Sequence, residues 1–484
     1  MSTVTVVPPA IEDAAAENAV AGPTAPASHA LAEQVVVMGV SGSGKSTIGA
    51  LLARSLGIPF LDADGLHPEA NIVKMASGLA LTDADRWPWL ALVGQALAEA
   101  GAAGGGLVIA CSALKQVYRD AILQAAPRVR FVHLAGSASV LATRLEGRSE
   151  HFMPPALLQS QLSTLEPLGS DEPGFAVDID QPVASILTLA VARLQAPELP
   201  ASVRLEIGTG GLPVLRVTGP GGSAEILLQG AHVTGWQPAG RPPVLWLSAE
   251  SDFAPGHAVR GGVPVCFPWF GPHETDAAAP LHGFARTADW QVISAQEQGD
   301  DVQLTLRLRD TPASRASAWP HRFTATLRVT VGENLTLALQ VTNDDATTVS
   351  FEEAFHTYLR VPDVCTVEVS GLDDRTFIDR LTGITSVHTD PVSFATATDR
   401  VYLGAAAHPE VSDPTGRIAA LRTIGAQSTV LWNPGSVKAA QMPDFGAAEW
   451  TDMVCVETAN VLTDRVTLAP GETRTMTVAI SGRA

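Results

Sequence analysis

The chain has 484 residues, of which 46% are hydrophobic and 17% charged, and its formal net charge at pH 7 is -19. At about 150 residues per domain, this length predicts two or three domains. The composition is that of a globular soluble protein, and we expect no transmembrane helix because every long apolar run is interrupted. The acidic balance argues against nonspecific nucleic-acid binding, so an anionic substrate must meet locally placed Arg, Lys and backbone N–H groups.

The N-terminal stretch and the cysteines indicate a cellular compartment. Residues 1–33 begin with a segment rich in Ala and Pro that lacks the basic start and apolar core of a secretion signal, and we expect a disordered leader there. Cys111, Cys266, Cys365 and Cys455 lie far apart without a CxxC pair. This predicts reduced thiols in the cytoplasm, most of them small core residues, and no disulfide framework or zinc site.

Residues 34–194 alternate between strand and helix patterns. VVVMG is followed by the helical segment KSTIGALLARSLG, and FLDAD, LVIACS and VRFVHLAG predict further strands. This alternation predicts an α/β domain with a parallel sheet and flanking helices. Residues 195–202, QAPELPAS, contain two prolines and no periodicity, and we expect them to form a linker.

Residues 203–484 follow a different rhythm. Segments such as VQLTLRLRD, FTATLRVTV and NLTLALQVTN alternate apolar and polar residues, and Gly, Asn, Asp and Pro separate them. This pattern predicts an antiparallel all-β domain, a large sandwich.

The segment GVSGSGKS, residues 39–46, matches the phosphate-binding loop GxxxxGK[ST] between a predicted strand and a predicted helix. Its glycines let backbone N–H groups point at phosphate oxygens, Lys45 reaches the β- and γ-phosphates, and the Ser46 hydroxyl faces Mg²⁺. The predicted nucleotide contacts are Gly39, Ser41, Gly42, Ser43, Gly44, Lys45, Ser46 and Thr47.

The strand LVIACS ends without the usual acidic metal residue, so a carboxylate must come from elsewhere. Asp62 and Asp64 follow the preceding strand, and alternation along an extended end turns both to the same side. One can then hold the metal shell while the other accepts the proton of an attacking hydroxyl. The alternative is a pair of ordinary acidic loop residues.

Two further segments concentrate polar side chains. After the second strand we expect one polar cluster of His67, Asn71, Lys74, Asp83, Asp85 and Arg86. In RLEGRSEHFMP we expect a mobile lid that brings cations over the transferring phosphoryl group, with Arg144, Arg148 and His151. A charged helix end is the alternative for this second segment.

The segments LDADGLHPEANIVKMASGLALTDADRWPWL, ACSALKQVYRD and HFMPPALLQSQLSTLEPL resemble the gluconokinase family of small P-loop sugar kinases, over essentially all of residues 34–195. The resemblance implies ATP- and Mg²⁺-dependent phosphorylation of D-gluconate, with Asp64 as base and Asp62 supporting Mg²⁺. It also implies a possible homodimer. Glu150 stands where we expect a small residue in this family. A kinase for another small metabolite, such as shikimate, is the alternative. The expected substrate contacts are His67, Lys74 and Arg86.

In the β domain, alternation along FHTYLRV puts His356, Tyr358 and Arg360 on one face, and alternation along MVCVE turns Glu457 away from its neighbouring valines. A His and a Glu that leave buried strands toward one cleft can form an acid/base pair near neutral pH. The alternative is a core histidine and an unrelated surface glutamate.

The segments RGGVPVCFPWFG, HGFAR, HTY, DRVY, WNP and MVCVETAN resemble the hexose-6-phosphate mutarotase family, a branch of the aldose 1-epimerase-like proteins, over about residues 203–484. The resemblance implies a large β-sandwich that interconverts the α and β anomers of glucose 6-phosphate, or of a similar aldose phosphate, without a cofactor. Trp269 and Phe270 either line the cleft or pack the core. The implied roles are base for Glu457, acid for His356, phosphate binding for Arg260 and Arg286, and hydroxyl binding for His282 and Asp399.

Together these features predict a bifunctional carbohydrate enzyme with two separate sites for small molecules, gluconate and a hexose 6-phosphate. The alternative from another class is a gluconate kinase whose β domain is a noncatalytic sensor of sugar phosphate. A sensor needs Arg260 and Arg286 but has no use for an acid and a base.

Overall fold

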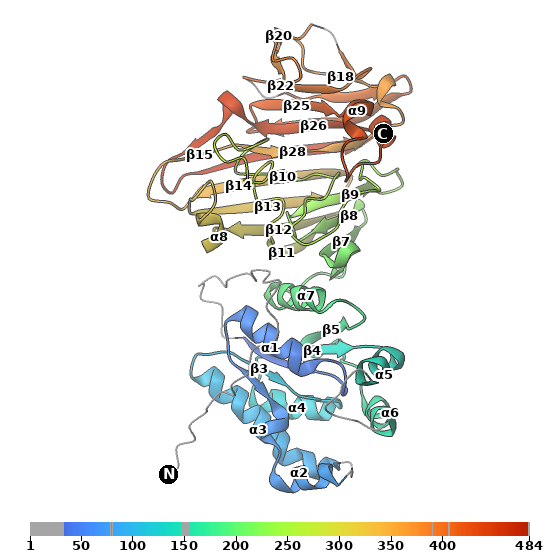
Figure 1. Ribbon diagram of the computed structural model, residues 1–484, viewed down its shortest axis with the longest axis vertical. Coiled ribbons are helices and arrows are strands. Elements are labelled where there is room, and N and C mark those ends of the chain that lie inside the picture. Colours follow the sequence, from blue (N-terminus) through green and yellow to red (C-terminus); the bar gives the residue numbers. More distant parts are fainter. Residues whose placement is uncertain are drawn as a thin grey trace.

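The structure, a computed structural model, describes residues 33–77, 79, 81–146, 155–389, 391–404 and 407–482. The predicted leader, apart from Glu33, lies outside the described residues. Figure 1 shows an α/β part and a β part that follow one another along the long axis of the molecule. In the described part of the chain, no helix is both long and apolar enough to cross a membrane.

The α/β part is built on a parallel sheet with the strand order β2-β3-β1-β4-β5. Its elements are β1 (Gln34–Met38), α1 (Lys45–Leu56), β2 (Phe60–Asp62), the 3-10 helix η1 (Ala63–Leu66), α2 (Glu69–Ala76), α3 (Asp83–Ala102), β3 (Leu107–Ala110), α4 (Gln116–Ala125), β4 (Val129–Ala135), α5 (Ala138–Glu146), α6 (Pro155–Thr164), β5 (Gly174–Asp178) and α7 (Val183–Gln195).

The central strand β1 is buried along its whole length, and its alternate side chains face different helices. Val35 and Val37 belong to an apolar cluster with residues of α1 and α7. Val36 and Met38 belong to a second cluster with residues of α3 and α4. The sheet is therefore covered on both faces, as its continuous apolar strand pattern predicts.

The β part consists mainly of two large antiparallel sheets. Its elements are β6 (Val203–Ile207), η2 (Thr209–Gly211), β7 (Pro213–Gly219), β8 (Gly222–Leu227), β9 (His232–Pro238), β10 (Val265–Cys266), β11 (Gln291–Gln298), β12 (Asp301–Arg309), α8 (Pro312–Arg315), β13 (Phe323–Val331), β14 (Asn334–Asn343), β15 (Val349–Phe351), β16 (Glu353–Phe355), β17 (Tyr358–Arg360), η3 (Val364–Thr366), β18 (Glu368–Ser370), β19 (Thr376–Asp379), β20 (Thr385–Val387), β21 (Val392–Ser393), β22 (Thr398–Tyr402), β23 (Glu410–Asp413), β24 (Gly416–Ile424), β25 (Ser428–Asn433), α9 (Gly435–Ala439), η4 (Glu449–Asp452), β26 (Met453–Asn460), η5 (Leu462–Asp464), β27 (Val466–Leu468) and β28 (Thr473–Gly482).

One large sheet has the order β11-β12-β13-β14-β28-β24-β23-β18-β21, and the other has the order β10-β16-β26-β25-β22-β19-β20 with β17 also paired to β26. Strands β13 and β14 alternate between buried and less buried residues, which is the pattern of a sheet with one face on a core. Strand β26 is buried at every position. The predicted fold classes, a parallel α/β domain and an antiparallel sandwich, are both confirmed.

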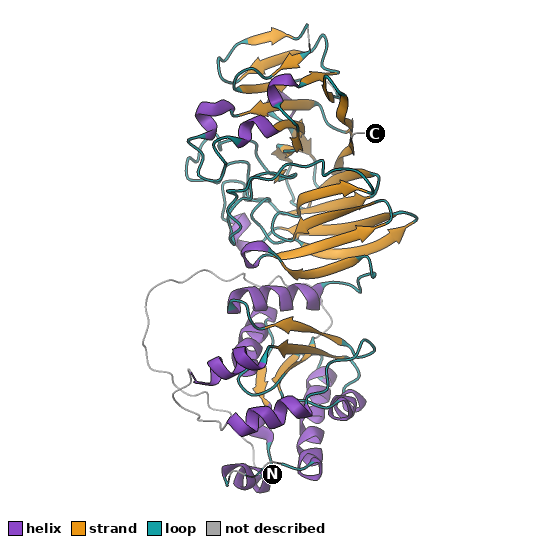
Figure 2. Cartoon of the chain, turned by 90° about the vertical axis from the view of Figure 1, so that its right-hand side faces the viewer, coloured by secondary structure: helices purple, strands orange, loops and turns teal. Residues whose placement is uncertain are grey.

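Helix α7 joins the two parts. It contacts α1 and β5 in the α/β part, and β6, β7 and β11 in the β part, and Figures 1 and 2 both show it between the parallel sheet and the sandwich. From this helix Arg193 donates to the carbonyl oxygen of Leu205 through Nε at 2.8 Å and Nη2 at 2.5 Å. Its guanidinium also lies 5.2 Å from the centre of the Phe175 ring. The expected linker thus spans a packed junction.

We predict that Arg193→Met lowers the stability of the full chain by about 1–3 kcal/mol, because the half-buried Leu205 carbonyl loses its donors. The shift of the thermal unfolding midpoint measures this loss. Arg204→Met, at an exposed position of β6, is the matched control and should leave the midpoint unchanged. Equal midpoints for the two variants would contradict a stabilising role for the Arg193 contact.

A buried carboxyl on β16 makes stability depend on pH. Glu353 is 1% exposed and its Oε1 accepts a hydrogen bond from Asn460 Nδ2 at 2.8 Å. Burial raises the pKa of Glu353 to about 7, against the opposing hydrogen bond from Asn460 and the charge of Arg474. An unfolded glutamate ionises near 4.5, so between these pH values the unfolded chain has lost a proton that the folded chain keeps. Stability therefore falls as pH rises through this window.

Between the lower and the upper end of this window, the free energy of unfolding of the wild-type chain should fall by up to about 3 kcal/mol. We predict that Glu353→Gln abolishes this fall, because glutamine does not ionise. Chemical unfolding at pH values below and above the window measures the difference. Glu368→Gln, at an exposed position of β18, is the control and should keep the wild-type pH dependence. A variant of Glu353 with unchanged pH dependence would refute this assignment.

Candidate active sites

The predicted phosphate loop connects β1 to α1, and glycines set its shape. Gly39, Gly42 and Gly44 have φ angles of 143°, 83° and 94°, values that disfavour any residue with a Cβ atom. Gly44 caps the N-terminus of α1, where unpaired N–H groups and the helix dipole attract anions. The loop therefore has the form that binds the phosphates of a nucleotide.

Lys45 and Ser46 begin α1, next to the carboxyl end of β2. Ser46 Oγ donates to Asp62 Oδ2 at 2.6 Å, and Lys45 Nζ donates to the carbonyl oxygen of Val40 at 3.0 Å. Hydroxyl and carboxylate oxygens are the ligands that Mg²⁺ prefers, so Ser46 and Asp62 fit the metal role predicted for them. Among the described residues no group of three or more His, Cys, Asp or Glu side chains is placed to hold a metal ion. Substrate phosphates and water would have to complete such a site.

Asp64 lies beyond the end of strand β2. The prediction that strand alternation turns Asp62 and Asp64 to the same side is therefore wrong. The strand β2 ends at Asp62, and the chain turns there into η1. Asp62 caps this 3-10 helix, because its Oδ1 accepts from the backbone N of Asp64 at 3.1 Å. Asp64 is exposed. Burial lowers the pKa of His67, and the negative charge of Asp64 opposes this effect. The Asp64 carboxylate therefore lies near His67.

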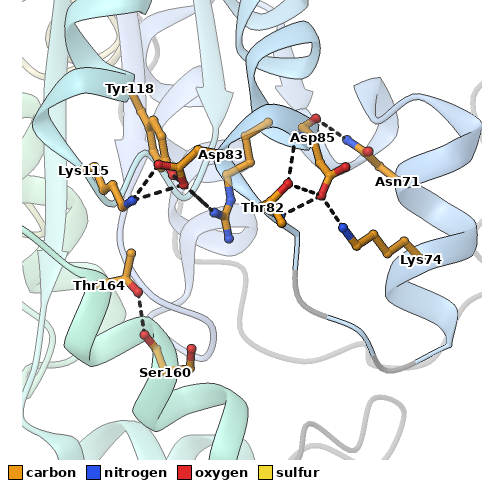
Figure 3. Close-up of polar contacts among 10 residues, drawn as sticks. Asn71, Lys74, Thr82, Asp83, Asp85, Lys115, Tyr118, Ser160 and Thr164 are labelled. Atoms are coloured by element: carbon orange, nitrogen blue, oxygen red, sulfur yellow. Dashed lines mark hydrogen bonds and ion pairs between the residues drawn. The ribbon is translucent and has the colours of Figure 1, made fainter.

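The structure brings the expected polar cluster together in two groups (Figure 3). In the first group Asp85 accepts from Lys74 Nζ at 2.5 Å, and the Asp85 carbonyl accepts from Asn71 Nδ2 at 2.8 Å. Asp85 also completes the N-terminal capping box of α3 with Thr82. The hydrogen bond from Lys74, and then those from Thr82, hold the pKa of Asp85 well below its usual range.

The second group surrounds Asp83. Its carboxylate accepts from Tyr118 Oη at 2.6 Å, from Lys115 Nζ at 2.9 Å and from Arg86 Nη1 at 3.4 Å. The hydrogen bonds from Tyr118 and then Lys115, followed by the charges of Lys115 and Arg86, lower the pKa of Asp83. The sequence prediction missed Lys115 and Tyr118, because they lie more than thirty residues from Asp83 and only the packing of α4 on α3 joins them. The segment ACSALKQVYRD, which contains both, was the available signal.

Two residues from helices α5 and α6 reach the phosphate loop. Arg144 Nη2 donates to the Ile179 carbonyl, and a Cβ atom placed on Gly44 would lie 3.8 Å from Arg144 Nη1. Gln161 Oε1 accepts from the backbone N of Ser41 at 2.7 Å, a contact that nothing in the sequence indicated. The other expected lid residues, Arg148 and His151, lie outside the described residues, as does Glu150.

In the β part, His356 and Glu457 lie side by side and are buried. His356 Nε2 is 3.4 Å from Glu457 Oε1, and their side chains are 9% and 1% exposed. Within the described residues, His356 Nδ1 and Glu457 Oε2 are buried without a hydrogen-bond partner. Buried polar atoms rarely stay unpaired, so these two mark a place for a ligand. The alternative in which Glu457 lies on the surface is excluded.

The strand expected through His356 is broken at that residue. β16 ends at Phe355 and β17 begins at Tyr358, and both pair with β26. His356 and Tyr358 still share a face, because their rings stack with centres 4.7 Å apart and planes 8° apart. Arg360, expected on the same face, is exposed.

Two arginines line a cavity of about 730 Å³ next to this stack. Arg260 donates to Asp444 Oδ2 at 2.9 Å through Nη2 and to Tyr358 Oη at 3.1 Å through Nη1. Arg286 Nε is buried without a partner among the described residues. A buried guanidinium with a missing acceptor favours an anionic ligand. The rest of the cavity is lined by Asp252, Gly256, His257, Ala258, Gln441, Met442, Pro443 and Asp444.

The electrostatic surroundings of the acid/base pair differ on its two sides. Burial lowers the pKa of His356 well below its usual value, and charges on His282, Arg260 and Arg286 lower it further. The histidine thus faces the arginines of the cavity.

Glu457 faces other groups. Burial raises the pKa of Glu457 well above its usual value, the charge of Asp399 raises it further, and Arg380 opposes both. Arg380 extends from the end of β19 and lies 5.8 Å from the centre of the Phe270 ring, and its backbone N donates to the Asp399 carbonyl at 2.8 Å. No sequence motif indicated Arg380.

His282 and Phe270 flank the pair. The His282 ring centre lies 4.7 Å from that of Phe270 and 5.5 Å from that of His356. Its Nδ1 accepts from the backbone N of Gly271 at 3.2 Å, and burial lowers its pKa to about 3, so the ring is neutral with Nε2 as donor. Trp269 is buried, donates to the Pro280 carbonyl and belongs to the sandwich core. Of the two aromatic residues, only Phe270 therefore contacts the expected site residues.

Comparison with known proteins places each part in a family. A family model described as aldose 1-epimerase matches residues 213–481, and one described as an AAA domain matches residues 35–168. A gluconokinase of Gluconobacter oxydans is 47% identical over 164 residues, which cover 34% of this chain and 92% of that protein. A Salmonella typhimurium protein provisionally assigned as a glucose-6-phosphate 1-epimerase is 40% identical over 257 residues, which cover 51% of this chain and 83% of that protein.

A solved structure supports the second match. A crystal structure from Salmonella typhimurium, provisionally described as a mutarotase, aligns with a TM-score of 0.55 and 32% sequence identity, over 63% of this chain and all of that chain. The chain therefore belongs to the aldose 1-epimerase family through residues 213–481 and to the gluconokinases through its N-terminal half, and it is a bifunctional carbohydrate enzyme.

Proposed function

We propose that the α/β part transfers the γ-phosphoryl group of ATP to D-gluconate, giving 6-phosphogluconate, and that the β part interconverts the α and β anomers of glucose 6-phosphate. The phosphate loop, with Ser46 and Asp62 in contact, supports the first activity. The single observation that carries the second is the buried contact between His356 and Glu457 beside a cavity lined by two arginines.

In the kinase site, the N–H groups of residues 39–47 and the Lys45 ammonium would hold the triphosphate, and Arg144 lies beside the same loop. Ser46 and Asp62 would hold Mg²⁺, which when bound neutralises phosphate charge. Asp64, exposed at the start of η1, would accept the proton of the attacking hydroxyl of gluconate. His67, Lys74 and Arg86 are the proposed gluconate contacts, and Lys115 adds a cation near the same place.

In the second site, the Glu457 carboxylate would take the proton from the C1 hydroxyl while protonated His356 gives one to the ring oxygen. The C1–O5 bond then breaks as the C1 carbonyl forms. After rotation about C1–C2, the O5 hydroxyl attacks the other face of the carbonyl, His356 takes the proton back, and Glu457 returns its proton to O1. Atoms and charges balance without a cofactor.

The different charged groups around His356 and around Glu457 support this orientation of the sugar phosphate. In a hexose 6-phosphate the phosphate is carried by C6 on C5, next to the ring oxygen, and O1 lies on the other side of that oxygen. His356, the proposed donor to the ring oxygen, faces Arg260 and Arg286. Glu457 faces Asp399, the proposed hydroxyl contact. These surroundings support phosphate binding by Arg260 and Arg286 and hydroxyl binding by Asp399.

The rival function, a noncatalytic sensor, leaves part of this arrangement unexplained. A sensor gains nothing from burying a histidine and a glutamate in contact, because burial of unpaired ionisable groups costs stability. Cytoplasmic location, a possible homodimer and the domain boundaries stay predictions from the sequence.

The first test uses each site as the control for the other. We predict that Asp64→Asn lowers gluconate phosphorylation about 100-fold or more, through loss of the base, and leaves anomer exchange intact. His356→Ala should do the reverse. Two-dimensional exchange NMR on the anomeric protons of glucose 6-phosphate and a coupled ADP assay measure the two rates. Tight binding of glucose 6-phosphate without faster exchange in the wild-type chain would favour the sensor.

A second test concerns Gln161. Its side-chain oxygen accepts a hydrogen bond from the Ser41 N–H, and we propose that this N–H binds a nucleotide phosphate. Gln161→Ala should tighten ATP binding about twofold to tenfold, because one hydrogen bond no longer has to be broken. Calorimetry measures the dissociation constant, and Gln159→Ala, exposed on the same helix, is the control. Weaker binding by Gln161→Ala would instead show that Gln161 contacts the nucleotide.

A further inference from the structure

The proposed acid of the second site is held where its protonated form is disfavoured. The groups that face His356 are Glu457 on β26, Tyr358 on β17, and His282, Arg260 and Arg286 from the loops around β10. Tyr358 and His282 are neutral near pH 7, since burial raises the pKa of Tyr358 and lowers that of His282 to about 3. The two arginines remain as positive charges, and they oppose a third one on His356.

The two arginines differ in how their charge is balanced. Arg260 forms an ion pair with Asp444 and also donates to Tyr358 Oη, so its charge is largely compensated. Arg286 is in no ion pair among the described residues, and its buried Nε has no acceptor there. Burial accordingly lowers the pKa of Arg286 and the charge of Arg260 adds to this effect, while Cys266, Tyr358 and Asp444 oppose it without forming an ion pair with Arg286. The cavity thus contains a charge without an ion-pair partner, and this charge acts on His356.

We propose that the phosphate dianion of the substrate acts as a switch: by neutralising Arg286 it lets His356 take up the proton that the histidine then donates to the ring oxygen. This inference rests on the proposed anomerase function and deepens it. One proton passes from solvent to His356 as the dianion binds, then to O5 as the C1–O5 bond breaks, and back to His356 on ring closure. The phosphate is therefore required for turnover, beyond its role in affinity.

The dianion and the sugar can be supplied separately to test this. Glucose lacks the phosphate, and inorganic phosphite supplies a dianion of similar charge and shape. With the full chain, we expect phosphite to accelerate glucose anomer exchange about tenfold or more, and the acceleration should saturate as the cavity fills. Phosphite also catalyses the reaction in solution, but that contribution rises linearly and persists with His356→Ala, which serves as the background.

Variants separate a switch from a simple binding contact. Arg286→Gln should lose the phosphite acceleration and should anomerise glucose faster than the wild-type chain when no phosphite is present, because the opposing charge is gone. Arg328→Gln, at an exposed position of β13, is the matched control and should keep both wild-type rates. A residue that only binds phosphate would not raise the rate on glucose when it is removed.

The outcomes distinguish this inference from the function on which it rests. Saturable activation that Arg286→Gln abolishes would support the switch. Normal exchange of glucose 6-phosphate, with glucose exchange unaffected by phosphite and not raised in Arg286→Gln, would overturn the switch and leave the anomerase function standing. No exchange of glucose 6-phosphate at all would overturn both.

Discussion

The contact between His356 Nε2 and Glu457 Oε1 depends on the register of two short strands, β16 and β17, against β26. β26 is buried at every position and pairs with β16 before His356 and with β17 after it. Phe355 pairs with Thr458 and Tyr358 with Cys455, so His356 lies opposite Glu457 in an unshifted register, and Tyr358 stacks on the imidazole. The backbone N of Val456 also donates to the Thr357 carbonyl at 3.0 Å, so the chain stays bonded to β26 beyond His356. The sandwich thus provides rigidity on both sides of the pair, which is how a scaffold usually positions reactive groups.

The phosphate loop follows the same principle in the α/β part. β1 is fixed by apolar contacts on both faces, and α1 is fixed against α7 and β3. Between them the backbone takes positive φ angles at Gly39, Gly42 and Gly44, which only glycine adopts at low cost. The two sites differ in what surrounds them, however. The nucleotide site is reached by residues of α5 and α6, whereas the histidine and the glutamate lie in strands of the sandwich interior.

Local pattern was sufficient for much of this structure. Continuous apolar strands predict the parallel sheet, and period-two strands predict the antiparallel sandwich. This works because the number of buried faces of a strand determines the order of its apolar and polar residues. The phosphate loop and the His356 and Glu457 pair were found because motif and strand context coincide. Alternation failed where the backbone leaves the strand, at Asp64, because a 3-10 turn is decided by capping and tertiary contacts. Gln161, Tyr118 and Arg380 could not be found in this way, since only packing between distant segments brings them to the sites.

An acidic chain that handles anionic substrates needs cations that stay in place before the substrate arrives. The structure achieves this with its own carboxylates: Asp85 holds Lys74, Asp83 holds Lys115, and Asp444 holds Arg260. Such pairs fix the direction of each donor and lower the cost of gathering positive charges, but they also weaken the field that an incoming anion meets. Arg286 lacks a carboxylate of this kind among the described residues, and its charge acts on the groups around it, His356 among them. A single uncompensated guanidinium can therefore contribute affinity for the phosphate and suppress the acid until the phosphate is bound.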